Sequence, residues 1–183
     1  IKEELKLPEK EIQVTSGQVD QKFIQEKNDF RITNDALGVG TNRERLLDNI
    51  SAIRYLKIIE SEGRLANKEE QDVLSKYVGW GGLSEVFDDA STLTWAKTGY
   101  SALKELLTDD EFRSARESTL NAHYTAPTII RAMYDGLRQL GFKTGNILEP
   151  SCGTGNFMGM LPDDLVKSKF YGVELDDLTG RIA

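Results

Sequence analysis

Residues 146–157 read NILEPSCGTGNF, and this stretch decides the fold. Its first four residues predict a short apolar strand, residues 150–155 a glycine-containing loop, and residues 156–161 a short helix. Farther along, residues 169–174 predict a second strand, and another helix begins at Asp176. A strand, a helix and a second strand with a short connection form a parallel unit with a right-handed crossover. The sequence therefore predicts an α/β unit that begins at residue 146.

The middle of the chain, residues 41–120, predicts helices. Their starts are marked by capping-box pairs, in which a side-chain oxygen and a carboxylate three residues later satisfy free backbone N–H groups. These pairs are Thr41 with Glu44, Asn67 with Glu70, and Thr108 with Glu111. We expect the three helices to end near Gly63, Gly79 and Glu117. Trp80 is expected to pack between helices rather than to stack on a base.

Two further segments complete the predicted organisation. Residues 1–40 are polar and predict a linker or arm, with a short extended piece at residues 11–15. Residues 121–183 hold the α/β part, which opens with residues 125–127 (TAP), a cap followed by a proline in the first helical turn. The apolar face that follows predicts a helix that ends at Gly141.

Composition excludes several classes of protein. Of the 183 residues, 39% are apolar and 29% are charged, which is enough apolar material for a packed core. One cysteine and one histidine exclude a disulfide framework and a zinc site built from these residues, so we predict no metal. The same scarcity of cysteine leads us to expect a reducing, cytoplasmic setting. No apolar run approaches the roughly 18 residues of a membrane span, so we expect no membrane partner. Because the chain begins with Ile1 rather than Met, we expect a piece of a longer protein.

The charge balance bears on nucleic-acid binding. The chain has 23 basic and 30 acidic residues, and acidic residues outnumber basic ones in each of the parts 1–30, 31–120 and 121–183. Strong DNA affinity needs several Lys or Arg side chains on one face to neutralise phosphates. The sequence therefore predicts weak DNA binding by these residues alone.

The glycine-containing loop indicates a ligand other than a nucleoside triphosphate. Gly153 and Gly155 let the backbone turn sharply after a strand and approach a ligand closely. The loop lacks the Lys-Ser/Thr of a P-loop, and Gly159 completes G-x-G-x-x-x-G rather than a dinucleotide fingerprint. Cys152, within the loop, is interpreted as a small buried residue rather than a nucleophile.

Two acids stand at the predicted strand ends. Glu149 precedes the loop, where a carboxylate would repel a pyrophosphate but would suit a cationic or hydroxyl-bearing ligand. Glu174 ends the second strand, at the position where a carboxylate can accept hydrogen bonds from ribose hydroxyls. The pair predicts a nucleoside that carries a positive charge.

Three segments resemble the motifs of a known family. Residues 148–157 (LEPSCGTGNF) resemble the first motif of N6-adenine DNA methyltransferases of the amino class with the gamma motif order. Residues 171–176 (YGVELD) resemble the second motif, and residues 123–127 (HYTAP) resemble the tenth, which precedes the first in that order. The helical residues 77–83 and 114–116 are similar to those that precede the methylase in very large helicase–methylase proteins of conjugative elements and phages.

The resemblance implies a fold class and a division into domains. We expect an α/β chain in which an N-terminal, mainly helical region (residues 41–120) is followed by the truncated start of a Rossmann-like S-adenosylmethionine-dependent methyltransferase domain (residues 121–183). A complete sheet of this family has more strands than residues 146–183 can supply. We therefore expect this domain to be incomplete.

The resemblance also implies the cofactor, S-adenosylmethionine, and the residues that would contact it. The implied cofactor-binding residues are Tyr124, Thr125, Glu149, Pro150, Gly153, Gly155, Phe157, Glu174 and Leu175. Tyr124 and Thr125 would border the methionine end of the cofactor, and Glu149 would lie near its ammonium group. Glu174 would bind the ribose hydroxyls, and Leu175 would pack on the adenine.

The catalytic motif of the family is Asn or Asp, then Pro-Pro, then Tyr or Phe, and it holds the target amino group of a flipped base. No such sequence occurs in residues 1–183, so we assign no catalytic residue and expect the motif beyond Ala183. The full-length parent would bind DNA and methylate adenine N6, whereas this chain alone would be inactive. Its unpaired strand edges would favour self-association or loose order of the methylase-like end.

Two other functions stay open. The methylase-like part could be a non-catalytic interaction module of a helicase-type protein from a mobile element. The sequence downstream of Ala183 would separate this alternative from the methyltransferase, because it would contain or lack the catalytic motif. A dinucleotide-dependent oxidoreductase is a third alternative, opposed by Glu149 and by the glycine spacing.

Overall fold

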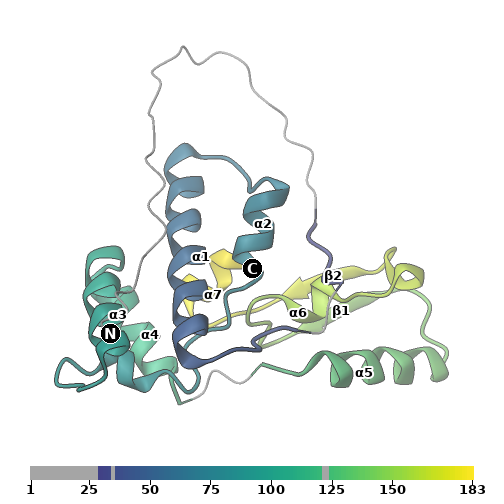
Figure 1. Cartoon of the computed structure of the whole chain (residues 1–183). Helices are drawn as coiled ribbons and strands as arrows, with labels where there is room; N and C mark the ends of the chain where they lie inside the picture. Colours follow the sequence, from purple (N-terminus) through teal and green to yellow (C-terminus); the bar gives the residue numbers. More distant parts are fainter. Residues whose placement is uncertain (1–28, 34–35, 121–123) are drawn as a thin grey trace, which may run out of the picture.

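The structure is a computed structural model that describes residues 29–33, 36–120 and 124–183. The extended piece expected at residues 11–15 and most of the expected linker lie outside the described residues, as does His123 of the tenth-motif resemblance. The described part is mixed α/β, mostly helical, with a two-stranded parallel sheet (Figure 1). Its elements are α1 (Asn42–Glu62), α2 (Lys68–Leu74), η1 (Ser84–Phe87), α3 (Thr94–Leu106), α4 (Asp109–Ser118), α5 (Pro127–Gln139), β1 (Asn146–Glu149), α6 (Asn156–Gly159), η2 (Asp163–Leu165), β2 (Lys169–Gly172) and α7 (Asp177–Ile182).

All three predicted helix starts are confirmed, because α1, α2 and α4 each begin with a complete capping box. In the box of α1, the Glu44 N–H donates to Thr41 Oγ1 (3.3 Å), and the Thr41 N–H donates to Glu44 Oε2 (2.7 Å). The helix ends at Gly63, as predicted. Helix α3 has no side-chain cap, so this signal did not mark it as a separate helix.

The predicted end of α2 near Gly79 is wrong, because this helix ends at Leu74. The next residues leave the helix to join the core: the Tyr77 N–H donates to Leu74 O in a tight turn, and Tyr77 is 1% exposed. The Val78 N–H then donates to Asn49 Oδ1 on α1 (2.9 Å) instead of to a helical carbonyl. Tertiary contacts therefore shorten the helix.

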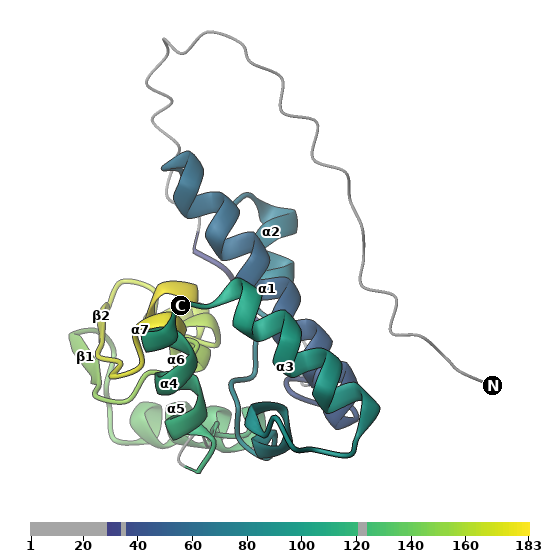
Figure 2. The same cartoon turned by 90° about the vertical axis from the view of Figure 1, so that its left-hand side faces the viewer.

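The main hydrophobic core lies between α1, α3, α4, the turn after α2 and α7 (Figure 2). Trp80 is fully buried there, and its ring meets those of Tyr77 and Phe87 edge to face, which confirms its interpretation as a packing residue. Leu178 and Ile182 of α7 belong to the same core. Helix α7 therefore packs with α1, and the α/β part contributes this helix to the core of the helical part.

The sheet pairs β1 with β2 in parallel, with Asn146 opposite Lys169 and Glu149 opposite Gly172. The predicted end of the second strand at Glu174 is wrong. Because β1 ends at Glu149, no strand remains to pair beyond Gly172, and Val173 O accepts the N–H of Cys152 from the loop instead. Helix α6 also ends earlier than predicted, since the residue before Pro162 is disfavoured in a helix.

Helix α5 lies alongside the sheet (Figure 1) and packs against α6, η2 and the segments around them. Its Ile130 and Tyr134 form a second, smaller core with Met160 and Leu165, and the Tyr134 hydroxyl donates to Phe157 O (2.6 Å). On the strands, Leu148 and its register partner Tyr171 are exposed by 64% and 42%. The outer face of the sheet therefore exposes Leu148 and Tyr171, and the Lys169 ammonium group lies over the Tyr171 ring at 5.0 Å from its centroid. Within the described part, no helix has both the length and the apolar character of a membrane span.

Candidate functional site

A pocket of about 680 Å³ opens at the carboxyl ends of β1 and β2. Seven of the nine implied cofactor-binding residues line it: Tyr124, Thr125, Glu149, Gly153, Phe157, Glu174 and Leu175. Pro150 and Gly155 do not. Pro150 is exposed in the turn, and Gly155 is a buried N-cap of α6 with a φ of +78°. The carboxyl ends of parallel strands are the usual place for ligands in α/β proteins, so we take this pocket as the candidate site.

Glu174 fixes the shape of the glycine loop (residues 150–155). Its Oε2 accepts the N–H of Gly153 (2.8 Å), and its Oε1 accepts the N–H of Asp176 (2.9 Å). Hydrogen bonds to a carboxylate are stronger than those between neutral groups. The loop and the start of α7 are therefore both tied to one side chain at the pocket wall.

Glu149 and Cys152 lie on the other side of the same loop. The Ser151 N–H donates to Glu149 Oε1 (3.3 Å), and the second carboxylate oxygen accepts no hydrogen bond from the described residues. Cys152 is half-buried rather than fully buried as expected, because its side chain lies at the edge of the sheet beside Gly172. Burial and the nearby Glu174 carboxylate raise the pKa of the Cys152 thiol, so it is a poorer nucleophile than a free cysteine.

Helix α4 supplies a wall of the pocket that the sequence did not predict. Ser114, Glu117 and Ser118 line the pocket from this helix. The Ser114 hydroxyl donates to Asp176 Oδ1 (2.8 Å), and Asp176 Oδ2 accepts the Thr179 N–H (3.0 Å) as the N-cap of α7. The only sequence signal was the resemblance of residues 114–116 to helicase–methylase proteins, which assigned no role to these residues.

Tyr124 and Thr125 reach the pocket from the segment before α5. The sequence predicts a cap at residues 125–127. The N-cap of α5 is Ala126, and no side chain, including that of Thr125, caps the helix. The Thr125 side chain is thus not engaged in capping and stands at the pocket wall. Burial, together with the charges of Glu174 and Asp176, raises the pKa of the Tyr124 hydroxyl, which keeps it protonated and able to donate a hydrogen bond.

The pocket is acidic. Its described lining includes the carboxylates of Glu117, Glu149, Glu174 and Asp176 and contains neither Lys nor Arg. Negative charge gathered in a cleft attracts cations and repels anions such as pyrophosphate. The described residues contain no group of three or more His, Cys, Asp or Glu side chains arranged to hold a metal ion. The charge of the pocket therefore favours a cation over an anion.

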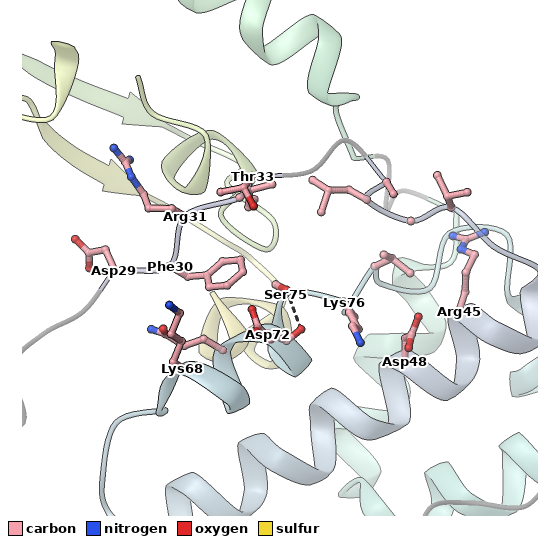
Figure 3. Close-up of a pocket in the computed structure, with 17 residues that line it drawn as sticks. Asp29, Phe30, Arg31, Thr33, Arg45, Asp48, Lys68, Asp72, Ser75 and Lys76 are labelled. Carbon is pink, nitrogen blue, oxygen red and sulfur yellow. Dashed lines mark hydrogen bonds between the residues drawn. The ribbon is translucent and has the colours of Figure 1, made fainter. Parts of the chain in front are cut away.

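A larger hollow of about 840 Å³ lies where the segment around Phe30 crosses α1 and α2 (Figure 3). Acidic and basic side chains alternate around it, with Asp48 close to Lys76 and Asp72 on the same side as Lys68. Burial raises the pKa of Asp48, and the Lys76 charge opposes this change. Mixed charge selects neither cation nor anion, and none of the implied cofactor-binding residues lines this hollow.

Comparisons with protein-family models, with curated proteins and with solved structures give no match to the chain.

Proposed function

We propose that the pocket at the strand ends binds S-adenosylmethionine. The observation that carries this proposal is that Glu149, Glu174 and the glycine loop meet in one acidic pocket with no basic residue in its described lining. The cofactor has a positively charged sulfonium and an ammonium group, so such a pocket attracts it, whereas a dinucleotide would bring a repelled pyrophosphate. We also propose that β1, α6 and β2 belong to a Rossmann-like domain.

Three residues of the pocket have surroundings that suit a contact with S-adenosylmethionine. The two oxygens of Glu174 each accept one backbone N–H, and each keeps a further lone pair for a ribose hydroxyl. Glu149 has a carboxylate oxygen available for the ammonium group. Leu175 is 99% exposed beside the pocket, which suits a side chain that would cover the adenine ring.

We further propose adenine in DNA as the methyl acceptor, on the resemblance of residues 148–157 and 171–176 to the methyltransferase motifs. S-adenosylmethionine supplies an electrophilic methyl group when it is bound. The chain contains no Asn/Asp-Pro-Pro-aromatic sequence to hold the acceptor amine. We therefore expect residues 1–183 to bind the cofactor weakly and to transfer no labelled methyl groups to duplex DNA. Transfer by the purified chain would contradict this part of the proposal.

Calorimetric titration with S-adenosylmethionine tests the cofactor directly. Glu174→Gln should weaken binding by about 1–3 kcal/mol, because the ribose hydroxyls lose a charged acceptor. The same substitution should weaken binding of an analogue that lacks both ribose hydroxyls by less, and the loss that remains would come from the Gly153 or Asp176 N–H bond that the glutamine amide nitrogen cannot accept. Asp177→Asn is the matched control, since Asp177 is an exposed carboxylate near the pocket but outside its lining. Absence of binding to the wild-type chain, or tighter binding of NAD, would refute the proposal.

A non-catalytic interaction module is a second candidate, favoured by the exposed apolar residues on the outer face of the sheet. Leu148, Tyr171 and Val173 are 64%, 42% and 55% exposed there. Exposed apolar surface of this kind is typical of protein contacts. This candidate predicts association without cofactor binding, so the same titration together with light scattering separates the two functions.

A further inference from the structure

The Tyr124 ring fills a gap between two glycines that are far apart in the sequence. A Cβ atom on Gly79 would lie 2.4 Å from the Tyr124 hydroxyl oxygen, and one on Gly153 would lie 2.8 Å from Tyr124 Cε1. Real Cβ atoms essentially never approach other atoms this closely. Both glycines also have positive φ values, +64° for Gly79 and +54° for Gly153, which side chains disfavour. The ring therefore packs directly on two pieces of backbone.

The Gly79 side of this contact is anchored in the helical core by Asn49. This side chain of α1 is fully buried, and both ends of its amide are used. Asn49 Nδ2 donates to Gly79 O (2.7 Å), and Asn49 Oδ1 accepts the N–H of Val78 (2.9 Å). A buried amide with satisfied hydrogen bonds fixes the backbone that it holds. The fully buried Trp80 follows directly and fixes the turn from its other end.

The Gly153 side of the contact leads to the pocket. The N–H of Gly153 donates to Glu174 Oε2 (2.8 Å), so the position of Gly153 sets that of the loop and of its carboxylate partner. Contacts thus run without interruption from Asn49 through Gly79, Tyr124 and Gly153 to Glu174. We call this series the Tyr124 column. It connects the core of the helical part to the candidate ligand site.

We propose that Asn49 and Gly79 are positioning residues for the ligand pocket, although neither belongs to the glycine loop. They fix Tyr124, and Tyr124 holds the loop in the shape that the ligand meets. A site held in its binding geometry before the ligand arrives loses less affinity to ordering. The identity of the ligand rests on the proposed function, whereas the mechanical link does not.

The link can be tested without any ligand, because Cys152 is the single cysteine of the chain and stands in the loop next to Gly153. Gly79→Ala should displace Tyr124, loosen the loop and speed alkylation of Cys152 by iodoacetamide several-fold. Gly63→Ala is a matched control, since Gly63 has nearly the same φ (+62°) but nothing within 4 Å of its Cβ position. Equal alkylation rates in the two variants would overturn the proposal.

Tyr124→Ala provides a second test, which remains decisive if Gly79→Ala alone does not fold. In a Tyr124→Ala background the clash is gone, so Gly79→Ala should lower the unfolding midpoint no more than Gly63→Ala does. In the wild-type background Gly79→Ala should lower it clearly more, or prevent folding altogether. An excess cost of Gly79→Ala that persists without the Tyr124 ring would show that the contact does not exist in solution.

Titration with S-adenosylmethionine then tests the effect on the site. Gly79→Ala should raise the Kd about tenfold, the size expected when a pre-formed loop must be ordered on binding, and Gly63→Ala should leave it unchanged. Equal affinity in both variants would overturn the positioning role. If the wild-type chain does not bind this cofactor, the proposed function fails, and the alkylation rates alone decide whether Asn49 and Gly79 position the loop.

Discussion

Glu111 on α4 joins three helices, and its neutralisation by Glu111→Gln is the most informative stability test. Its carboxylate accepts from Lys57 of α1 (2.5 Å) and from Arg181 of α7, and it also closes the capping box with the Thr108 N–H (2.8 Å). Burial alone would raise its pKa. The hydrogen bonds from Lys57, Thr108 and Arg181 outweigh burial and hold the pKa of Glu111 at about 2.

The size of the effect follows from this pKa. The side chain is only 11% exposed, so solvent screens its ion pairs weakly. A carboxyl group titrates near 4.5 when unperturbed, and each unit of difference corresponds to about 1.4 kcal/mol. The charged form of Glu111 therefore contributes about 3 kcal/mol at pH 7. Because the folded-state pKa is the lower one, this contribution is complete above about pH 4.5 and is lost as the pH falls toward 2.

Urea unfolding of the wild type and of Glu111→Gln at pH 7 and at pH 3 measures the contribution of Glu111 to the free energy of unfolding and its dependence on pH. The two proteins should differ by about 3 kcal/mol at pH 7 and by less than half of that at pH 3. Glu105→Gln is the control, because Glu105 is exposed on α3. A difference of less than 1 kcal/mol at pH 7, or one that is the same at both pH values, would refute the reasoning.

Three further outcomes are expected. Asn67→Ala should destabilise the chain by about 1 kcal/mol in urea, because it removes the side-chain cap of α2; no change would mean that the cap is not formed. Leu148→Lys should reduce self-association in light scattering, since it places a charge on the outer sheet face; equal scattering would exclude that face. Filter binding to duplex DNA at physiological salt should be weak, and tight binding would reveal a basic surface that the charge balance hides.

The sequence predicts the parts of this fold that depend on neighbouring residues. Capping boxes at Thr41, Asn67 and Thr108 mark helix starts because the hydrogen bonds that they form are local. The end of α2 is not predictable in this way. It depends on the bond between Val78 and Asn49, 29 residues apart, and on the burial of Tyr77.

The same division holds for the candidate site. The meeting of Glu149 and Glu174 is predictable because Glu149 ends β1 and Glu174 follows β2, and the carboxyl ends of neighbouring parallel strands lie at one edge of a sheet. The part of the pocket wall that α4 forms is not predictable from the sequence. It depends on the bond between Ser114 and Asp176, which are 62 residues apart and belong to no shared local pattern. Only the packing of α7 against α4 brings them together.

The position of α7 has a consequence for synthesis on the ribosome. Arg181 contacts Glu60 of α1, 121 residues earlier in the chain, and its neighbour Ile182 completes the core beside that helix. At translation rates of about 5–20 residues per second, α1 is made roughly 6 to 24 s before these partners exist. During that interval its apolar stripe lacks its final cover. We therefore expect the nascent chain to expose this stripe to chaperones until α7 has left the exit tunnel.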